Sequence, residues 1–518
     1  MSRVMDIIKD ETLTYQQQLL QLARYAENTE GPFLQSEEYQ KAFAKGILCD
    51  LGEGMAPYRP RYIAPDYSIL MEKGCKFLEL DPPKDLLEAT NALLIMYKHV
   101  PSITSFPVYL GNLDTLLEPF VVKMDRDEAK KILKLFLLHI DKTLVDSFVH
   151  ADLGPKDSLT GRIILELTEE MQLAMPNLTL KYDSEVTPDD YAICAIKCML
   201  KTSKPSFANH KMFVSEWGED YVIASCYNGL KLAGGGYTLP RVRMYELSKE
   251  ATSIEDFKER VLPYYTELML QFMDNRIRFI VEQSNFFKSN FLVKEGFVKR
   301  ENFTGMFGLV GLGECCNNLL GITDKMKGYG HNKQADDLGV EIMEQLSSLI
   351  AAHKGLYCES TNNQYRLHAQ VGIDSDGREN SPGARISIGA EPELMDHILH
   401  SCRFHKFFPT GIGDIFKFEE TWYNTPESLL DIIKGALANG MRYFSGYLAN
   451  NDVVRVTGYL VKKSELEKLD RGEASLNQCT VFGQGARNTS NALDRRIESY
   501  DQSTGKYNYF VFKCRWSW

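Results

Sequence analysis

A cysteine and a glycine more than 200 positions apart are the residues best placed for chemistry in this sequence. Cys226 closes the run 220–226, whose apolar centre 221–224 is typical of a buried strand that delivers its last residues to a loop. Gly458 interrupts the β-branched and aromatic run 452–461, where a glycine usually marks a bulge or a close backbone approach. A free cysteine is most often a small buried hydrophobe, so each residue alone indicates only packing.

The pentapeptide 455–459, Arg-Val-Thr-Gly-Tyr, resembles the Arg-Val-x-Gly-Tyr signature of the glycyl radical enzymes. In that family the glycine stores an unpaired electron on its α-carbon. The electron is stabilised when the α-carbon is planar between an amide nitrogen and a carbonyl. Only glycine, which lacks a Cβ, flattens there without a steric penalty. The resemblance therefore implies that Gly458 is the site of a glycyl radical.

The segments around Cys226 resemble the core of the same enzymes in type and order. The family pattern has Pro-Asn-Leu-Thr before a strand, Thr-Pro opening a helix, Pro-Ser-Phe, and an Asp-Tyr-x-Ile-Ala strand that ends at the thiyl cysteine. The matching residues here are 176–179, 187–188, 205–207 and 220–224. The resemblance implies that the glycyl radical takes the hydrogen of the Cys226 thiol and that the thiyl radical attacks a substrate C–H bond. Because an S–H bond and an activated C–H bond are comparable in strength, the transfer is reversible.

The resemblance also implies how the radical arises. In the family, an iron–sulfur activase that uses S-adenosylmethionine removes a hydrogen from the glycine. A radical S-adenosylmethionine activase is therefore an expected partner at Gly458, and no cofactor is expected to be bound permanently.

The resemblance covers residues 100–518 and is strongest to the YjjI-type glycine radical enzymes, with local similarity to the anaerobic ribonucleotide reductases and pyruvate formate-lyase. It implies an α/β fold, a ten-stranded α/β barrel of two half-barrels, in which the Cys226 and Gly458 loops meet in a sealed interior. Residues 1–99 are expected to form a helical region packed on the barrel, and residues 440–518 the glycyl radical segment.

The elements that must position these residues follow from hydrophobic periodicity and capping residues. Helices are expected at 12–28, 34–50, 85–97, 125–148, 187–200, 337–353, 425–439 and 464–471. Strands are expected at 101–110, 175–182, 220–226, 303–313 and 441–445.

At three places the sequence differs from the motifs of related enzymes, and each difference argues against one type of reaction. Asn228 stands two residues after the cysteine, where diol dehydratases carry a glutamate general base, and an amide cannot take that proton. Ser225 replaces the first of two adjacent cysteines of pyruvate formate-lyase, which argues against acyl transfer to coenzyme A. Only Cys479 and Cys514 follow Gly458, so the four-cysteine zinc site of the anaerobic reductases is not expected, nor is any other metal. Hydrogen abstraction from a small hydroxylated substrate remains, with nucleoside-like and sugar-like compounds both open.

Two other functions stay open. The first is an anaerobic ribonucleotide or nucleoside reductase, which binding and radical-dependent reduction of nucleotides would identify. The second is a non-catalytic glycyl radical homologue that keeps the fold and acts as a partner protein. Failure of any activase to form a radical at Gly458 would favour this second alternative.

Further side chains are candidates for the substrate pocket, namely Asn228, Glu314, Cys315 and Asn362. Glu314 and Cys315 end a glycine-rich run that resembles a reductase barrel strand facing the active site. For Glu314 the alternative is a charge satisfied by the N-terminus of the next helix. Cys315 and the cysteine after it could relay electrons, although packing is the favoured role. Asn362 lies in a Thr-Asn segment comparable to one near the substrate in the reductases, with a turn role as the alternative.

Composition is that of a soluble globular protein in a reducing compartment. With 44% hydrophobic and 25% charged residues the chain has enough apolar residues for a large core. A net charge of -11 argues against nucleic acid or an anionic membrane as main partner. The 11 cysteines, an odd number, favour reduced thiols in the cytoplasm over a disulfide framework. No signal peptide and no apolar run of membrane-spanning length is found. A small-molecule substrate is the expected ligand, and a homodimer is compatible with the sequence.

Overall fold

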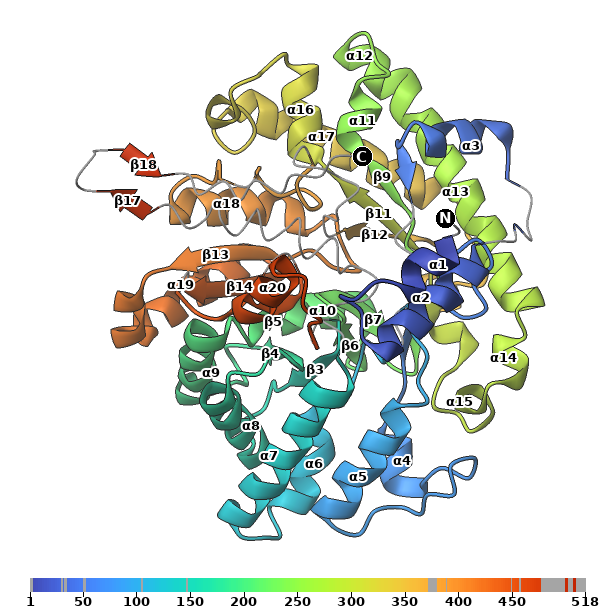
Figure 1. The fold of residues 1–518 in the computed structure, drawn as a ribbon. Coiled ribbons are helices and arrows are strands. Elements are labelled where there is room, and N and C mark those ends of the chain that lie inside the picture. The colour runs from blue at the N-terminus through green and yellow to red at the C-terminus, as the bar shows by residue number, and fades with distance from the viewer. Residues whose placement is uncertain are drawn as a thin grey trace.

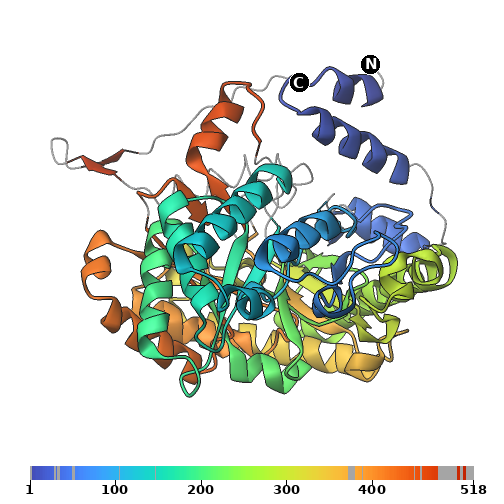
Figure 2. The ribbon, with the colours of Figure 1, turned by 90° about the horizontal axis from the view of Figure 1, so that it is seen from below.

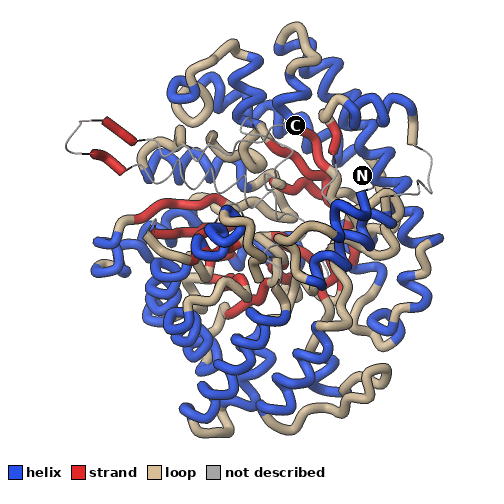
Figure 3. The backbone as a smooth tube through the Cα atoms, viewed as in Figure 1, coloured by secondary structure: helices blue, strands red, loops and turns tan. Residues whose placement is uncertain are grey.

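The computed structural model describes residues 3–28, 31, 35–49, 53–103, 106–145, 148–370, 380–387, 389–448, 450–455, 458–476, 499–501 and 506–508. Most of its strands gather in the middle of the molecule with helices around them, whereas β17 (Ser499–Asp501) and β18 (Lys506–Asn508) project at one edge (Figure 1, Figure 3). The mixed α/β fold expected from the sequence is confirmed. Closure of the strands into a ten-stranded barrel stays a prediction.

The helices begin where short polar side chains cap them. Thr14, Asp125 and Asn332 each accept hydrogen bonds from backbone N–H groups of the first turn, at the starts of α2, α7 and α17. The helices are α1 (Arg3–Ile8), α2 (Tyr15–Glu27), α3 (Glu37–Ala44), α4 (Ser68–Lys73), α5 (Leu86–Tyr97), α6 (Leu113–Val121), α7 (Arg126–Thr143), α8 (Leu159–Met171), α9 (Asp189–Thr202), α10 (His210–Trp217), α11 (Met244–Ser248), α12 (Ile254–Asp256), α13 (Leu262–Arg278), α14 (Phe286–Ser289), α15 (Phe291–Lys294), α16 (Leu312–Leu319), α17 (Lys333–Ala352), α18 (Leu394–His405), α19 (Pro426–Ala438) and α20 (Lys463–Asp470).

The largest sheet has five strands in the order β13–β14–β5–β4–β3. Neighbours run parallel except β14 and β5, which are antiparallel. Every residue of β3 and β4 is buried, as expected for strands covered on both faces. The strands are β3 (His150–Leu153), β4 (Asn177–Tyr182), β5 (Ser206–Asn209), β13 (Asp414–Phe418) and β14 (Tyr443–Leu448).

Two shorter sheets continue one another. The four-stranded sheet has the order β1–β9–β11–β12 and the three-stranded sheet the order β10–β8–β2. Backbone bonds from Met306 to Thr238 (3.0 Å) and from Gly308 to Pro240 (2.9 Å) bridge the break between them. The strands are β1 (Leu48–Cys49), β2 (Tyr62–Ala64), β8 (Gly234–Gly236), β9 (Arg241–Arg243), β10 (Phe303–Thr304), β11 (Met306–Val310) and β12 (Arg366–Ala369).

In the part of the chain that the structure describes, three antiparallel hairpins pair only with themselves. They are β6 (Tyr221–Ala224) with β7 (Asn228–Lys231), β15 (Val453–Arg455) with β16 (Leu460–Lys462), and β17 (Ser499–Asp501) with β18 (Lys506–Asn508). The first two carry the candidate residues Cys226 and Gly458 in their turns.

Several expectations need correction. The helix expected at 34–50 ends at Ala44, and Leu48–Cys49 pair with β9 as β1. No strand forms in the described part of 101–110; instead the Leu110 amide bonds to the His150 carbonyl (2.8 Å) at the edge of β3. The strand expected to reach 313 ends at Val310, because Gly311 turns with a φ of 76° into α16.

The N-terminal region is more than a packed helical layer, because β1 and β2 join the sheets of the later chain. Helices α1 and α2 lie on the same side of the molecule as α20 (Figure 2), and Gln17 Nε2 of α2 donates to the Ser475 carbonyl (3.3 Å). In the expected radical segment 440–518, residues 477–498, 502–505 and 509–518, with Cys479 and Cys514, lie outside the described residues. Among the described helices, none has the length and apolar character needed to cross a membrane.

Candidate active site

Cys226 lies at the tip of the β6–β7 hairpin. Ala224 pairs with Asn228, so the three residues 225–227 form the turn. Ser225 has a φ of 61°, so the turn begins with a residue in the left-handed conformation. The strand expected before the cysteine is therefore present and ends at Ala224.

The five-stranded sheet fixes the backbone of this turn. His150 Nδ1, on β3, donates to the Ser225 carbonyl (2.8 Å), and the Tyr443 hydroxyl, on β14, donates to the Cys226 carbonyl (3.1 Å). Both side chains also bond to Thr179 of β4, at 2.8 and 2.7 Å. Burial lowers the pKa of His150 to about 3. The imidazole is therefore neutral, and because a carbonyl only accepts, its proton sits on Nδ1.

The opposite side of the turn contacts the second group of strands. The Tyr227 hydroxyl donates to the Ala369 carbonyl of β12 (2.7 Å), and its ring stacks on His368 of the same strand. A Cβ on Gly411 would lie 2.3 Å from the Tyr227 carbonyl oxygen, so this backbone approach requires glycine. The Cys226 turn is thus held between the two groups of strands.

Gly458 lies directly against Cys226. A Cβ built on Gly458 would lie 2.3 Å from the Cys226 Cβ and 2.7 Å from its Sγ. Both distances are too short for a non-bonded contact, so a side chain does not fit at this position. Cys226 is 3% exposed and its neighbours on both loops, Tyr227 and Tyr459, are also buried. The structure therefore brings the two predicted residues together inside the molecule, although they are far apart in sequence.

Arg455 holds the glycine loop in this position. Its Nη1 donates to the Gly458 carbonyl (3.3 Å), and its Nη2 donates to Asn177 Oδ1 (3.1 Å) and to the Ser203 carbonyl (3.0 Å). Asn177 Nδ2 lies 3.5 Å from both the Gly458 and the Ser225 carbonyl oxygens. Arg455 and Asn177 therefore link the two loops through neutral oxygen acceptors.

These supporting residues were missed as functional residues, yet the sequence held a signal for two of them. Arg455 is the first residue of the glycine signature and Asn177 belongs to the Pro-Asn-Leu-Thr segment. His150 and Tyr443 lie in no such segment. Their contribution depends on the packing of β3 and β14 against the hairpin.

The Cys226 side chain is a thiol at neutral pH. Burial raises the pKa of Cys226 to about 12, against the opposing effects of a contact with Ser225 and of the cations Arg455, Arg61 and Arg385. The S–H bond is therefore intact in the resting protein. This state suits hydrogen-atom transfer and disfavours a thiolate nucleophile.

Asn228 is the first residue of β7, two positions after Cys226, and is 1% exposed. Its side chain lies near the Tyr62 hydroxyl, whose pKa burial raises. Among the residues that the structure describes, neither polar atom of the Asn228 carboxamide has a partner at hydrogen-bond geometry. A buried amide in this state is uncommon in folded proteins, so Asn228 stays a candidate for contacting substrate.

Glu314 and Cys315 lie on helix α16 and not at a strand end. The Glu314 carboxylate accepts from Ser381 Oγ (2.6 Å), the Ser381 amide (3.2 Å) and Ser387 Oγ (2.7 Å). It therefore anchors the segment 380–387 to α16. Burial raises the pKa of Cys315, a contact with Ser248 opposes it, and the thiol packs between α11 and α16.

Asn362 is exposed and has a φ of 54° in a left-handed turn. This conformation agrees with the turn role. Thr361, the residue before it, points inward instead, with 2% exposure and a hydroxyl 3.3 Å from Thr304.

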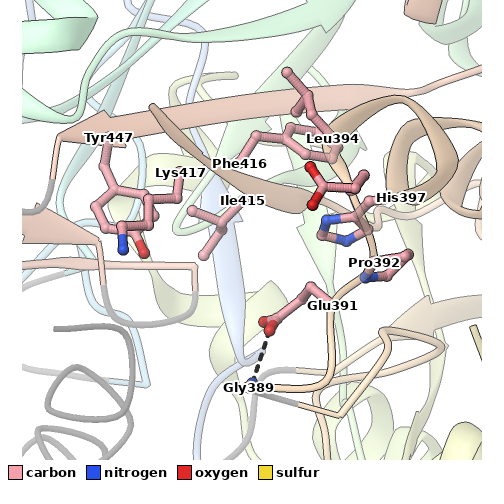
Figure 4. Close-up of a pocket in the computed structure, with 10 residues that line it drawn as sticks. Gly389, Glu391, Pro392, Leu394, His397, Ile415, Phe416, Lys417 and Tyr447 are labelled. Carbon is pink, nitrogen blue, oxygen red and sulfur yellow. Dashed lines mark hydrogen bonds between the residues drawn. The ribbon is translucent and has the colours of Figure 1, made fainter. Parts of the chain in front are cut away.

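A separate cavity of about 550 Å³ contains none of the predicted site residues. Figure 4 shows its lining side chains, with the Gly389 amide donating to Glu391 (2.7 Å). His397 lines it and lies 3.3 Å from Asp414. The cavity is therefore distinct from the Cys226–Gly458 contact.

Solved structures of the same fold define the class. An anaerobic ribonucleotide reductase matches with a TM-score of 0.67 and 13% identity over 84% of this chain and 81% of the other. A structure for 1,2-propanediol dehydration in Roseburia inulinivorans matches with a TM-score of 0.62 and 10% identity over 86% and 82%. These likenesses show that the fold is that of glycyl radical enzymes.

Sequence similarity gives the particular family. The family described as "Glycyl radical enzyme YjjI-like" matches residues 13–498. An uncharacterized Haemophilus influenzae protein is 46% identical over 499 residues, 95% of this chain and 97% of that protein. The uncharacterized protein YjjI of Escherichia coli is 40% identical over 506 residues, 96% and 97% respectively. The chain belongs to the YjjI-like glycyl radical enzyme family, and the resemblance predicted from its motifs is confirmed.

Proposed function

We propose that the protein is an oxygen-sensitive enzyme in which Gly458 stores a radical and Cys226 uses it to abstract hydrogen from a small hydroxylated substrate. The contact of the Gly458 backbone with the Cys226 side chain carries this proposal. The Gly458 α-carbon radical takes the hydrogen atom of the Cys226 thiol, which restores the C–H bond and leaves the unpaired electron on sulfur. The thiyl radical then takes a hydrogen atom from a substrate carbon, which restores the thiol and leaves a substrate radical.

The surroundings of the two residues support this chemistry. The thiol is protonated at neutral pH and buried, so hydrogen is available to the neighbouring glycine and water is kept away. A radical site enclosed by two half-barrels in a ten-stranded barrel agrees with the two groups of strands that hold the Cys226 turn. The partner that supplies the radical is a radical S-adenosylmethionine activase, and the compartment is the cytoplasm.

Anaerobic activation tests the proposal. Protein incubated with a radical S-adenosylmethionine activase, S-adenosylmethionine and a reductant is expected to give an organic-radical signal in electron paramagnetic resonance. Labelling the protein with glycine carrying 13C at the α-carbon should broaden that signal by hyperfine coupling. Exposure to air should then cut the chain at Gly458, because oxygen adds to a carbon radical, and mass spectrometry should detect the C-terminal fragment.

The outcomes separate the alternatives. A signal unchanged by the 13C label, or an uncut chain after air exposure, would contradict a radical at Gly458. Absence of any radical with every activase tried would favour a non-catalytic partner protein. Radical-dependent reduction of added nucleotides would identify an anaerobic nucleotide reductase.

A further inference from the structure

Two buried arginines lie near the Cys226 turn, each through a glycine that packs against it. Arg455 reaches it through Gly458, whose backbone touches Cys226. Arg385 reaches it through Gly413. Its Nε donates to the Gly413 carbonyl (2.6 Å), and a Cβ on that glycine would lie 2.9 Å from the Tyr227 ring. Both guanidinium groups act electrostatically on the Cys226 thiol.

The positive charge of these arginines is incompletely compensated. Arg455 is bound by neutral oxygens. Among the described residues it makes no ion pair, and its buried Nε has no hydrogen-bond partner. Arg385 Nε lies 3.9 Å from Asp414, but that carboxylate also binds Ser401 (2.6 Å) and lies 3.3 Å from His397. Burial, with a smaller contribution from the charge of Arg385, lowers the pKa of Arg455. The two cations therefore repel one another in a poorly solvated interior.

Two polar groups near the Cys226 turn lack hydrogen-bond partners among the described residues. Arg385 is 6% exposed, and its buried Nη2 has no such partner there. Neither polar atom of the buried Asn228 carboxamide has a partner at hydrogen-bond geometry in this part of the chain, and the Tyr62 hydroxyl lies beside it and near Cys226. Buried donors of this kind are normally satisfied, so a ligand that accepts hydrogen bonds and carries negative charge would complete them.

We infer that the substrate carries an oxyanion, a carboxylate or a phosphate, bound by Arg385 beside Cys226 with Asn228 donating a further hydrogen bond. The inference rests on the proposed function, because the anion would position a neighbouring substrate C–H bond at the thiol. An arginine suits this role because its planar fork matches two oxygens of a carboxylate or phosphate. A neutral polyol alone would leave the charge of the two arginines uncompensated.

Binding to the protein before activation tests the inference without turnover. The probes are acetate, inorganic phosphate, glycerate and glycerol 3-phosphate, with glycerol as the neutral member of the series. At least one anion should raise Tm and give a heat of binding under anaerobic conditions, and glycerol should not. The stronger of glycerate and glycerol 3-phosphate would distinguish a carboxylate from a phosphate substrate.

Variants locate the site. Arg385→Gln should weaken anion binding about 10- to 100-fold, the range expected for losing a charge-assisted contact, and Arg385→Lys should retain part of it. Arg403→Gln removes a half-exposed arginine that pairs with Asp337, and it should leave anion binding unchanged. If Arg385→Gln does not fold, Asn228→Ala supplies the second measurement and should weaken binding several-fold.

Anion binding that is equal in Arg385→Gln and Arg403→Gln would overturn the inference, as would glycerol binding as tightly as the anions. So would the absence of binding by all four anions at millimolar concentration. A radical signal at Gly458 in the same preparation would show that the proposed function survives such a failure. Absence of that signal, with anion binding that depends on Arg385, would contradict the proposed function and leave the oxyanion site intact.

Discussion

At the scale of single residues, both the available space and the chemistry constrain the pair Cys226 and Gly458. The missing Cβ of Gly458 is what allows its backbone to reach the thiol. The buried, protonated Cys226 is poorly suited to nucleophilic attack, and its neighbour Asn228 cannot act as a base. The residues at this point therefore favour one-electron chemistry.

Replacement of the thiol gives a prediction that needs no substrate. In D₂O the thiol exchanges to S–D, so reversible transfer between Cys226 and Gly458 places deuterium on the Gly458 α-carbon. The two-line radical signal from one α-hydrogen should therefore collapse toward a single line in the wild-type protein. In Cys226→Ala the radical should form but keep its two lines in D₂O, and turnover should be lost.

The half-buried Cys402 offers a matched control, because its thiol bonds to the Ala436 carbonyl of α19 and belongs to neither candidate hairpin. Cys402→Ala should behave like wild type in D₂O. Collapse of the signal in Cys226→Ala would remove Cys226 from the transfer.

At the scale of elements, short motifs predicted Cys226 and Gly458. The positions of the other residues around them depend on the packing between elements. The strand before Cys226, the helices α7, α17 and α19 and the loop at Gly458 could be predicted from periodicity, caps and signatures. Arg385 could not, because it lies in no motif. Its place depends on Glu314 anchoring the segment 380–387 to α16. Glu314 itself was expected at a strand end, and the left-handed Gly311 moves it onto the helix.

Lys204, which supports the segment before β4, gives a prediction for stability. Its Nζ donates to the carbonyls of Ala174 (3.1 Å) and Pro176 (2.6 Å), and burial lowers the pKa of Lys204 to about 7. Between about pH 7 and the unfolded lysine pKa of about 10.4, the unfolded chain binds more protons than the folded one at this residue. Lys204 therefore makes stability rise with pH across this window.

The slope of the unfolding free energy against pH should be lower in Lys204→Met, by the amount that corresponds to about one bound proton per molecule. Urea unfolding between pH 7 and 9 measures this slope. The variant should also be less stable at pH 9, because it loses two hydrogen bonds. Lys131→Met, at an exposed position of α7, should keep the wild-type slope. An unchanged slope in Lys204→Met would show that the lysine is charged in the fold throughout this range.

At the scale of the whole molecule, the two candidate residues sit on hairpins that are not part of the large sheets. Among the described strands, β15 and β16 pair only with each other, so the hairpin can leave its place without breaking a ladder of the five-stranded sheet. Gly458 is buried against Cys226, so an activase must gain access to an atom that the folded interior covers. The hairpin is therefore the element expected to move when the activase binds.

Hydrogen exchange tests this expectation. Amides of 453–455 and 460–462 should exchange faster than those of β4, by about tenfold or more, because the strand pairing described for them lies within the hairpin, whereas β4 is paired on both sides. Addition of the activase should increase the difference while β4 stays protected. Equal protection of the hairpin and β4, with and without activase, would contradict the expectation.

The tight fit at Gly458 also bears on how an active member of this family can be told from an inert one. A homologue that has lost radical chemistry would still need glycine at position 458, because any larger residue would collide with Cys226. Packing does not require a cysteine at position 226, because alanine or serine would fit in the same space. The sulfur is thus the atom whose presence packing leaves unexplained, and it is the better marker of a working catalyst.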